Sequence, residues 1–591
     1  KIRRYDGEMR SQHEEWIKLY AINELEDYPK EGKLTAEFLR ANDKLMLDTV
    51  FYPAGFKWQL LGAMDDLEEQ LDGLLIHSEN FQALNLLQDR YREKVKCVYI
   101  DPPYNTGNDD FLYRDGYQKS SWLAMIAHQL SLGRAMNSRD GVIFESIGED
   151  SISSLKALTQ EIYGIGNFVA AVTRVAKRTS DKGTHFRPTK DYVLVAAKDR
   201  PELSEFGVAK NPDEKDYKLV DSDGRKYKQS GASLFQPSLD SRPNQRYYIE
   251  APDGNLIIPP GKNFPKVAKD GEKVIPANNS DKVWRWSVDT YLTKKNTLIF
   301  TKGSDKNPLI DQNGNRSKWN VYPKVFLDDD QNSALHPEDI IYDFPNSKGT
   351  KELKKLAIDF AFAKPSELIM FLNRLLPFRA ATTLDYFAGS GTTAHAVINL
   401  NREDNGSRNY ILVEMGDHFD TVLKPRIQKV VYSADWKDGK PTAPETGISH
   451  GFKYLRLESY EDALNNLDLG EDRAPDLLGL DDQVREDFLF SYLLDVETRG
   501  HLLNLDRFRD PWGCQLKIHD PHTGRGEARA VDIVETFNYL LGVTVREIRV
   551  QGTSDKPDAF LTIEGENPAG VAILIIWRRL EANPNVEERN G

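Results

Sequence analysis

The sequence predicts an α/β fold centred on a parallel, doubly wound, Rossmann-like sheet. Short apolar runs with strand character alternate with helical patterns in two separate parts of the chain. The first part contains the runs 74–77, 95–100 and 142–147, and the second contains 382–385 and 410–414. Such alternation is typical of strands joined by crossover helices, which places the strands side by side and parallel.

The chain has 591 residues, too many for one hydrophobic core, so we expect several domains. Residues 1–70 are predicted to form a helical arm, and 71–200 and 346–435 the two halves of the sheet. Between these halves, 201–345 are rich in Pro, Gly, Asn, Asp and Tyr and lack the alternation, which indicates an insert. Residues 436–591 mix helix and strand patterns and are expected to form a C-terminal α+β domain.

Composition restricts the class of protein. The net charge of −14 argues against indiscriminate binding to nucleic acid, although it permits a local basic groove. Two cysteines, Cys97 and Cys514, fit neither a disulfide framework nor a metal cage. The apolar run 570–577 is far too short to span a membrane, and no basic, apolar leader is recognisable, so we expect a cytoplasmic protein. We expect no metal.

The first candidate site follows the strand 95–100. Asp101 comes directly after this strand, and Pro102 and Pro103 then end it because a proline nitrogen cannot donate to a β ladder. Asp101 therefore lies at the carboxyl end of a strand, the edge where open α/β sheets bind ligands. Tyr104 adds an aromatic ring to the same loop.

These groups suit an exocyclic amino group of a nucleobase. Such an amine has two N–H donors on a flat ring, so Asp101 and the Pro102 carbonyl can accept both hydrogens while Tyr104 stacks on the ring. A flipped base has these requirements. The alternative is an ordinary strand-ending turn, which would be the simpler interpretation if the loop stood alone.

A second candidate site follows the strand 382–385. After Asp385 the segment 387–393 forms a glycine-containing turn into an apolar helix, where Gly389 and Gly391 would let a ligand approach backbone amides. The next strand ends at Glu414, about where dinucleotide-type folds place the carboxylate that holds ribose hydroxyls. The turn lacks Gly-Lys-Ser/Thr, which argues against a nucleoside-triphosphatase loop.

Together these motifs resemble a known family. DPPYNTG (101–107) upstream of FAGSGTT (387–393), with FAFAKPSEL (360–368) just before the latter, is similar to the DNA methyltransferases that methylate amino groups and carry the target-amine motif first. Residues 418–436 and 451–467 look like the modification subunit of Type III restriction-modification systems.

The resemblance implies an adenine-N6 DNA methyltransferase that takes its methyl group from S-adenosylmethionine. It implies that 71–200 is the catalytic half, 201–345 the target-recognition domain, 346–435 the cofactor-binding half and 436–591 a partner or dimerisation domain. The implied catalytic residues are Asp101, Pro102, Pro103 and Tyr104. The implied cofactor-binding residues are Phe362, Lys364, Pro365, Asp385, Phe387, Gly389, Ser390, Gly391, Thr392 and Glu414.

The same resemblance implies double-stranded DNA, a restriction (helicase-nuclease) subunit and a second copy of the chain as partners. Two alternatives stay open: cytosine-N4 methylation, because that amine presents the same two donors, and a DNA-reading scaffold subunit of a defence complex. Intact Asp101, Tyr104 and both glycines speak against the scaffold. In the insert, Arg246 and Arg285 are candidates for base or phosphate contacts, because each has aromatic neighbours; alternatively they only help the insert to fold.

Overall fold

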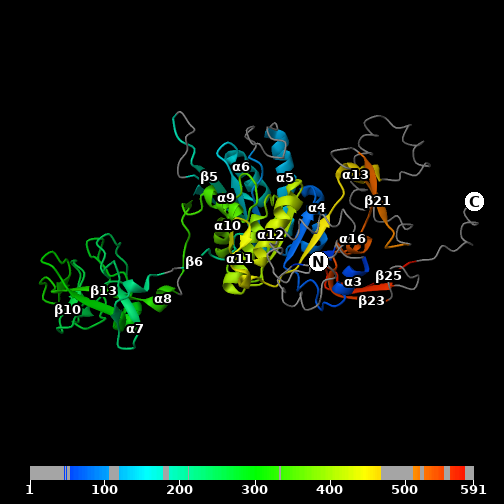
Figure 1. The fold of residues 1–591 in the computed structure, drawn as a ribbon. Helices are drawn as coiled ribbons and strands as arrows, with labels where there is room; N and C mark the ends of the chain where they lie inside the picture. The colour runs from blue at the N-terminus through cyan, green and yellow to red at the C-terminus, as the bar shows by residue number, and fades with distance from the viewer. Residues whose placement is uncertain are drawn as a thin grey trace, which may run out of the picture. The chain divides into compact units, whose positions relative to one another are not determined.

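The computed structural model divides the chain into two compact units, residues 1–206 with 338–591 and residues 207–337 (Figure 1). The residues that it describes are 46, 48–49, 54–104, 119–177, 185–209, 212–331, 334–466, 510–519, 525–551 and 560–579. Most of the predicted N-terminal arm and all of 467–509 therefore lie outside the described residues. The boundaries of the five predicted domains stay predictions.

A nine-stranded sheet forms the centre of the first unit. Its strand order is β15-β4-β5-β3-β2-β16-β17-β1-β20, and every neighbouring pair is parallel except the two that involve β5. The strands are β1 (Gly73–His77), β2 (Val95–Ile100), β3 (Asn137–Ile147), β4 (Phe168–Val175), β5 (Lys190–Ala197), β15 (Ile340–Ile341), β16 (Thr382–Asp385), β17 (Asn409–Glu414) and β20 (Phe452–Arg456). The predicted sheet is confirmed, and β16 from the second half of the chain lies between β2 and β17.

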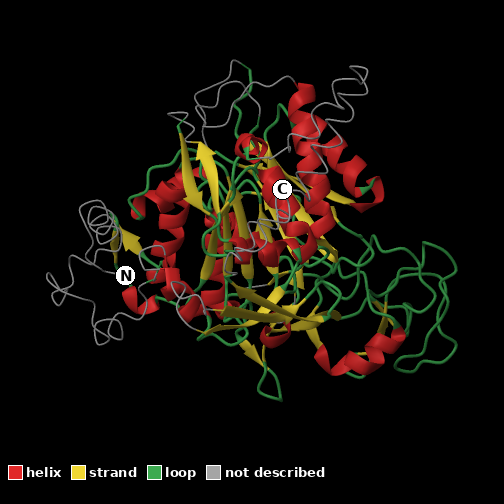
Figure 2. Ribbon diagram, turned by 90° about the vertical axis from the view of Figure 1, so that its right-hand side faces the viewer, coloured by secondary structure: helices red, strands yellow, loops and turns green. Residues whose placement is uncertain are grey.

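Helices cover both faces of this sheet, as a doubly wound fold requires (Figure 2). Successive strand residues point to opposite faces, so Leu74 and Ile76 join one core and Leu75 joins the other. The first core includes α4 (Asn80–Tyr91), α5 (Lys119–Met136) and α6 (Ile152–Tyr163). The second includes α9 (Asn346–Lys355), α11 (Thr392–Asp404) and α12 (Lys424–Tyr432). Helix α10 (Ser366–Arg374) packs against α11.

A further core joins the described end of the predicted arm to the C-terminal region. Trp58 of α3 (Ala54–Leu61) and Leu67 pack with Ile548 and Ile563 of the antiparallel sheet β23-β24-β25. The C-terminal elements of this core are α16 (Ile533–Leu540), β23 (Thr544–Gln551), β24 (Phe560–Glu566) and β25 (Ala572–Arg578). Short elements nearby in the sequence are β18 (Trp436–Lys437), β19 (Lys440–Pro441), α13 (Tyr460–Asn465), β21 (Gln515–His519) and β22 (Gly526–Ala530).

Strand β20 belongs to the sheet although it falls in the range that we expected to form the C-terminal domain. Its Lys453 is half-buried and donates to Glu68 at 2.7 Å and to Glu535 of α16 at 2.6 Å. Burial opposes the charge of Glu68, but Lys453 and Arg90 hold the pKa of that carboxyl at about 2. The chain before β1 and helix α16 are therefore tied to the central sheet by partly buried ion pairs.

The second unit consists of short antiparallel sheets. Its strands are β6 (Val208–Ala209), β7 (Leu219–Val220), β8 (Lys226–Gln229), β9 (Ile249–Glu250), β10 (Leu256–Ile258), β11 (Leu298–Lys302), β12 (Ile310–Asp311), β13 (Trp319–Phe326) and β14 (Ala334–Leu335), and its helices are α7 (Val288–Lys294) and α8 (Leu327–Gln331). Aromatic residues fill its core, among them Tyr247, Trp284 and Tyr291. No helix within the described ranges is long and apolar enough to cross a membrane.

Arg246 in this unit is not available to DNA. Its side chain is fully buried, and its guanidinium donates to the backbone carbonyls of Asn263 at 2.8 Å, Pro259 at 2.6 Å and Lys282 at 2.8 Å. The hypothesis that Arg246 contacts DNA is therefore wrong, because this arginine cross-links loops of its own unit. Arg285 is exposed and stays a candidate.

One acidic residue lies inside the apolar face of the sheet. Glu145 of β3 is fully buried, and it accepts a hydrogen bond of 2.7 Å from the Thr159 hydroxyl. Its other carboxyl oxygen has no hydrogen-bond partner among the described residues. Burial raises the pKa of Glu145 to about 8, so this carboxyl is mainly protonated at neutral pH.

We expect this carboxyl to make stability fall as pH rises. The unfolded chain loses the proton near its usual pKa of 4.5, whereas the folded chain keeps it until about pH 8. Across that window the folded state binds more protons, so raising the pH costs about 1.4 kcal/mol per pH unit at most. In Glu145→Gln, the free energy of unfolding measured with denaturant should change less between pH 5 and pH 8 than in the parent. The exposed Glu161→Gln serves as the control, and an unchanged pH dependence in Glu145→Gln would contradict the expectation.

Candidate functional site at the carboxyl edge of the sheet

Three acidic side chains meet at one edge of the large sheet. Asp101 follows β2, Asp385 ends β16, and Glu414 ends β17. These strands are adjacent and parallel, so their carboxyl ends lie together. One pocket is lined by all three residues.

Nearly all predicted site residues line this pocket. They are Asp101, Pro102, Pro103, Tyr104, Phe362, Lys364, Asp385, Phe387, Gly389, Ser390, Thr392 and Glu414. Pro365 and Gly391 do not line it. Residues that we did not predict complete the wall: Tyr99, Asp191, Asn346, Phe360, Ala363 and Ala388. The roles of these residues toward a ligand stay predictions.

An ion pair joins the two motifs across the pocket. The Nζ atom of Lys364 lies 2.5 Å from both carboxyl oxygens of Asp101. The same ammonium lies 5.1 Å from the centre of the Tyr104 ring. The implied role of Lys364 in cofactor binding stays a prediction. Its side chain is directed at Asp101, and the ammonium occupies the space between a carboxylate and an aromatic face.

The Asp-Pro-Pro-Tyr loop is fixed from outside the pocket. The Trp122 indole N–H donates to the Pro103 carbonyl at 3.0 Å, and the Ser151 hydroxyl donates to the Tyr104 carbonyl at 2.9 Å. A Cβ atom on Gly148 would lie 2.8 Å from the Tyr104 ring, so the glycine leaves room for that ring. Within the described part of the chain, no donor reaches the Pro102 carbonyl. The loop thus holds Tyr104 in place and leaves an acceptor open.

An amide of the glycine turn already makes a hydrogen bond within the protein. The Gly389 amide donates to Glu414 at 2.8 Å, as does the Gly416 amide, so these N–H groups orient the carboxylate. Gly391 has a φ of +79°, and a Cβ atom there would lie 3.1 Å from Leu423 instead of in the pocket. Gly391 permits a left-handed turn against Leu423, and its implied role in cofactor binding stays a prediction.

Asp385 also supports the turn. It accepts hydrogen bonds from the Phe387 amide at 3.0 Å and from the Thr393 hydroxyl at 2.5 Å. Burial raises the pKa of Asp385 to about 7 despite these bonds. Its carboxyl therefore connects the end of β16 to the start of α11.

A buried arginine, Arg174, holds two of the lining residues that we did not predict. Arg174 is fully buried and donates to Asp191 at 2.7 Å and to Asn346 at 2.7 Å, and both of these residues line the pocket. Asp191 reaches this edge because β5 is antiparallel to its neighbours, so the residues near its start lie beside the carboxyl ends of the parallel strands. Asp191 could have been predicted as a lining residue only if the direction of β5 had been known.

Among the described residues, no group of three or more His, Cys, Asp or Glu side chains is placed to hold a metal ion. The pocket instead combines carboxylates, hydroxyls, aromatic rings and one ammonium. Residues 95–424 match the family model described as DNA methylase, which is more than half of the 591 residues. The chain belongs to the DNA methylase family.

Similar proteins refine this family placement. The chain is 29% identical over 388 residues to the Mod subunit of the Type III restriction-modification enzyme EcoPI of Escherichia phage P1, covering 58% of this chain and 57% of that subunit. It is 25% identical over 489 residues to the Mod subunit of the probable Type III enzyme HindVI of Haemophilus influenzae, covering 76% of this chain and 63% of that subunit. The expected resemblance to Type III modification subunits is confirmed, although the chain spans less than two thirds of these relatives.

Solved structures of DNA methylases are more distant from this member of the family. The cytosine-N4-specific PvuII DNA methyltransferase is 12% identical with a TM-score of 0.30, covering 60% of this chain and 86% of that one. The M1.HpyAVI–SAM complex is 13% identical with a TM-score of 0.27, covering 60% and 99%.

Proposed function

We propose that the chain transfers a methyl group from S-adenosylmethionine to adenine N6 in duplex DNA, and that it is the modification subunit of a restriction-modification system. The observation that carries this proposal is the shared pocket, which Asp101, Pro102 and Tyr104 line together with residues of the glycine turn and Glu414. Membership of the DNA methylase family supports the reaction class. The similarity to the EcoPI and HindVI Mod subunits supports the place in a restriction-modification system.

The pocket has groups that fit S-adenosylmethionine. The Gly389 and Gly416 amides orient the Glu414 carboxylate, which lines the pocket as an acceptor for ribose hydroxyls. Phe362 lies at the pocket with 62% of its surface exposed and a φ of +63°, an unfavourable backbone conformation that presents an aromatic ring to a ligand. The cofactor would supply a methyl group bonded to a positively charged sulfur.

Asp101 and its neighbours would prepare the target amine. The Asp101 carboxylate and the open Pro102 carbonyl accept its two N–H groups, which draws the nitrogen lone pair away from conjugation with the ring. Tyr104 stacks on the flipped base, and such stacking is worth about 1–3 kcal/mol per base. The Lys364 ammonium now makes the contact with Asp101 that the amine would make, so it has to move aside when the base enters.

The partners follow from the same relatives. We propose double-stranded DNA as the substrate, and a restriction (helicase-nuclease) subunit and a second copy of the chain as assembly partners. The names of the EcoPI and HindVI proteins, which are subunits of restriction-modification enzymes, support an assembly of this kind.

Nucleoside analysis tests the proposed reaction. The purified chain, given duplex DNA and S-adenosylmethionine with a labelled methyl group, should yield labelled N6-methyldeoxyadenosine after digestion. Asp101→Ala should lose methyl transfer by roughly 100-fold or more, because its bonds act mainly in the transition state, while cofactor affinity measured by calorimetry stays close to that of the parent.

A matched control is Asp140→Ala. Asp140 also holds a lysine through both carboxyl oxygens, with Lys96 Nζ at 2.6 Å from each, but it does not line the pocket. Labelled N4-methyldeoxycytidine would favour the cytosine alternative. Cofactor binding without any transfer by the parent chain would favour the scaffold, and transfer by Asp101→Ala at the parent rate would refute the role of Asp101.

Substitutions of Arg246 and Arg285 should have different effects, one on the stability of the second unit and the other on the choice of methylation site. Arg246→Met should lower the stability of the second unit by about 2 kcal/mol or more, because several buried carbonyls lose their donor. Arg285→Ala should leave the melting temperature unchanged and relax the preference for one base pair of the methylated site. Melting curves and sequencing of methylated sites measure both effects. Unchanged site preference in Arg285→Ala would remove this residue from the readout.

A further inference from the structure

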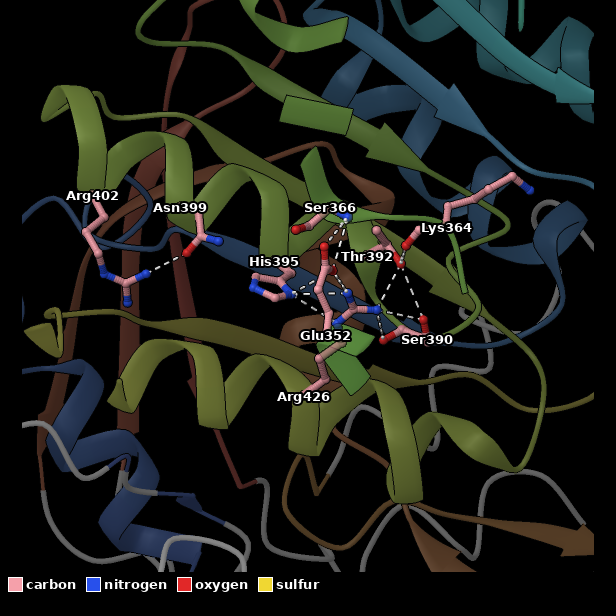
Figure 3. A network of polar contacts seen from close by, with 9 residues as sticks. All are labelled: Glu352, Lys364, Ser366, Ser390, Thr392, His395, Asn399, Arg402 and Arg426. Atoms are coloured by element: carbon pink, nitrogen blue, oxygen red, sulfur yellow. Dashed lines mark hydrogen bonds and ion pairs between the residues drawn. The ribbon is translucent and has the colours of Figure 1, made fainter. Parts of the chain in front are cut away.

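A buried arginine lies directly beneath the glycine turn. Arg426 of α12 is fully buried, and Figure 3 shows its guanidinium between the turn, α11 and Glu352. Burial lowers the pKa of Arg426 to about 10, while Glu352 opposes this change, so the guanidinium stays charged at neutral pH. Nothing in the sequence pattern distinguished this arginine from the other charges of its helix.

The guanidinium donates to two hydroxyls of the turn. Its Nη1 atom lies 2.8 Å from the Ser390 Oγ and 2.9 Å from the Thr392 Oγ1. Both of these residues line the pocket, whereas Arg426 does not. A hydroxyl that accepts a hydrogen bond from an arginine still has one hydrogen to donate. Arg426 therefore fixes the two oxygens. The Thr392 hydroxyl donates its hydrogen to the Lys364 carbonyl, and the Ser390 hydroxyl keeps one for an acceptor on the pocket side.

The same arginine links the turn to the segment that carries Lys364. Its Nη2 atom lies 3.2 Å from Glu352, whose carboxylate accepts the Ser366 amide at 3.1 and 3.2 Å. Ser366 begins α10, two residues after Lys364. The Thr392 hydroxyl also lies 3.4 Å from the Lys364 carbonyl. The glycine turn and the segment that carries Lys364 are thus connected through one guanidinium (Figure 3).

His395 completes the set of acceptors. Its Nδ1 atom lies 3.1 Å from Nη2 and 3.3 Å from Nε of Arg426. Burial and the neighbouring charge of Arg426 hold the pKa of His395 well below its usual value, so the ring is neutral and Nδ1 accepts. The planar fork of an arginine can reach all these groups at once, which a single ammonium cannot.

We propose that Arg426 is a positioning residue for the cofactor, acting through Ser390 and Thr392. This inference rests on the proposed function. The guanidinium fixes both hydroxyl oxygens in the pocket lining and adds positive charge at the start of α11, where the helix dipole also favours an anion. The acidic Glu414 would repel a carboxylate at its end of the pocket. Arg426 therefore positions the lining for the amino-acid end of the cofactor, which carries a carboxylate.

Calorimetry with two ligands tests this role. S-adenosylhomocysteine has the amino-acid end, and 5′-methylthioadenosine lacks it. Arg426→Met should weaken S-adenosylhomocysteine binding by roughly tenfold or more, because the turn loses charge-assisted hydrogen bonds, and should change methylthioadenosine binding by about twofold at most. Arg426→Lys keeps the charge without the fork, so its affinity for S-adenosylhomocysteine should fall between those of the parent and Arg426→Met.

Arg402→Met is the matched control. Arg402 also joins α11 to α12, by donating to the Val430 carbonyl at 2.7 Å, but it does not touch the turn. It should lose thermal stability and bind both ligands as the parent does. If Arg426→Met does not fold, Arg426→Lys decides between the outcomes.

Three results have separate meanings. Unchanged affinity for S-adenosylhomocysteine in a folded Arg426 variant would overturn the inference. An equal loss for both ligands would also overturn it, because it would mean that Arg426 only stabilises the fold. Failure of the parent chain to bind S-adenosylhomocysteine would instead refute the proposed function.

Discussion

The parallel pairing of β16 between β2 and β17 is the constraint on which the site depends. It brings the Asp101 loop and the glycine turn to one edge of the sheet, although the whole 201–345 segment separates them in the sequence. Buried apolar residues on both faces of these strands hold the register. Because the register is fixed, Asp101 and Lys364 can meet across the pocket as an ion pair.

Buried charges outside the pocket then orient what lines it. Arg174 holds Asp191 and Asn346 on one wall, and Arg426 holds Ser390 and Thr392 on another. A buried arginine is costly unless its donors are satisfied, and both of these have several acceptors. These four side chains are therefore fixed before any ligand enters, which reduces the entropy lost on binding.

The sheet and most of the lining could be predicted because they depend on local patterns: apolar strands, a double proline after Asp101, glycines before a helix. Residues such as Arg174, Asp191 and Arg426 could not, because their positions depend on strand direction and on contacts between distant segments. For Arg246 a local pattern led to a wrong prediction. Its aromatic neighbours indicated a ligand contact, but these residues form the core of a small unit that uses the arginine to bond its own carbonyls.

We propose that one pocket receives both the cofactor and the target amine. A crystal structure of the chain with S-adenosylhomocysteine would show whether it does. We expect the ribose hydroxyls to bond Glu414, the amino-acid end to lie against Ser390 and Thr392, and the sulfur to face Asp101. A ligand bound away from β2, β16 and β17, or one whose sulfur faces away from Asp101, would contradict it.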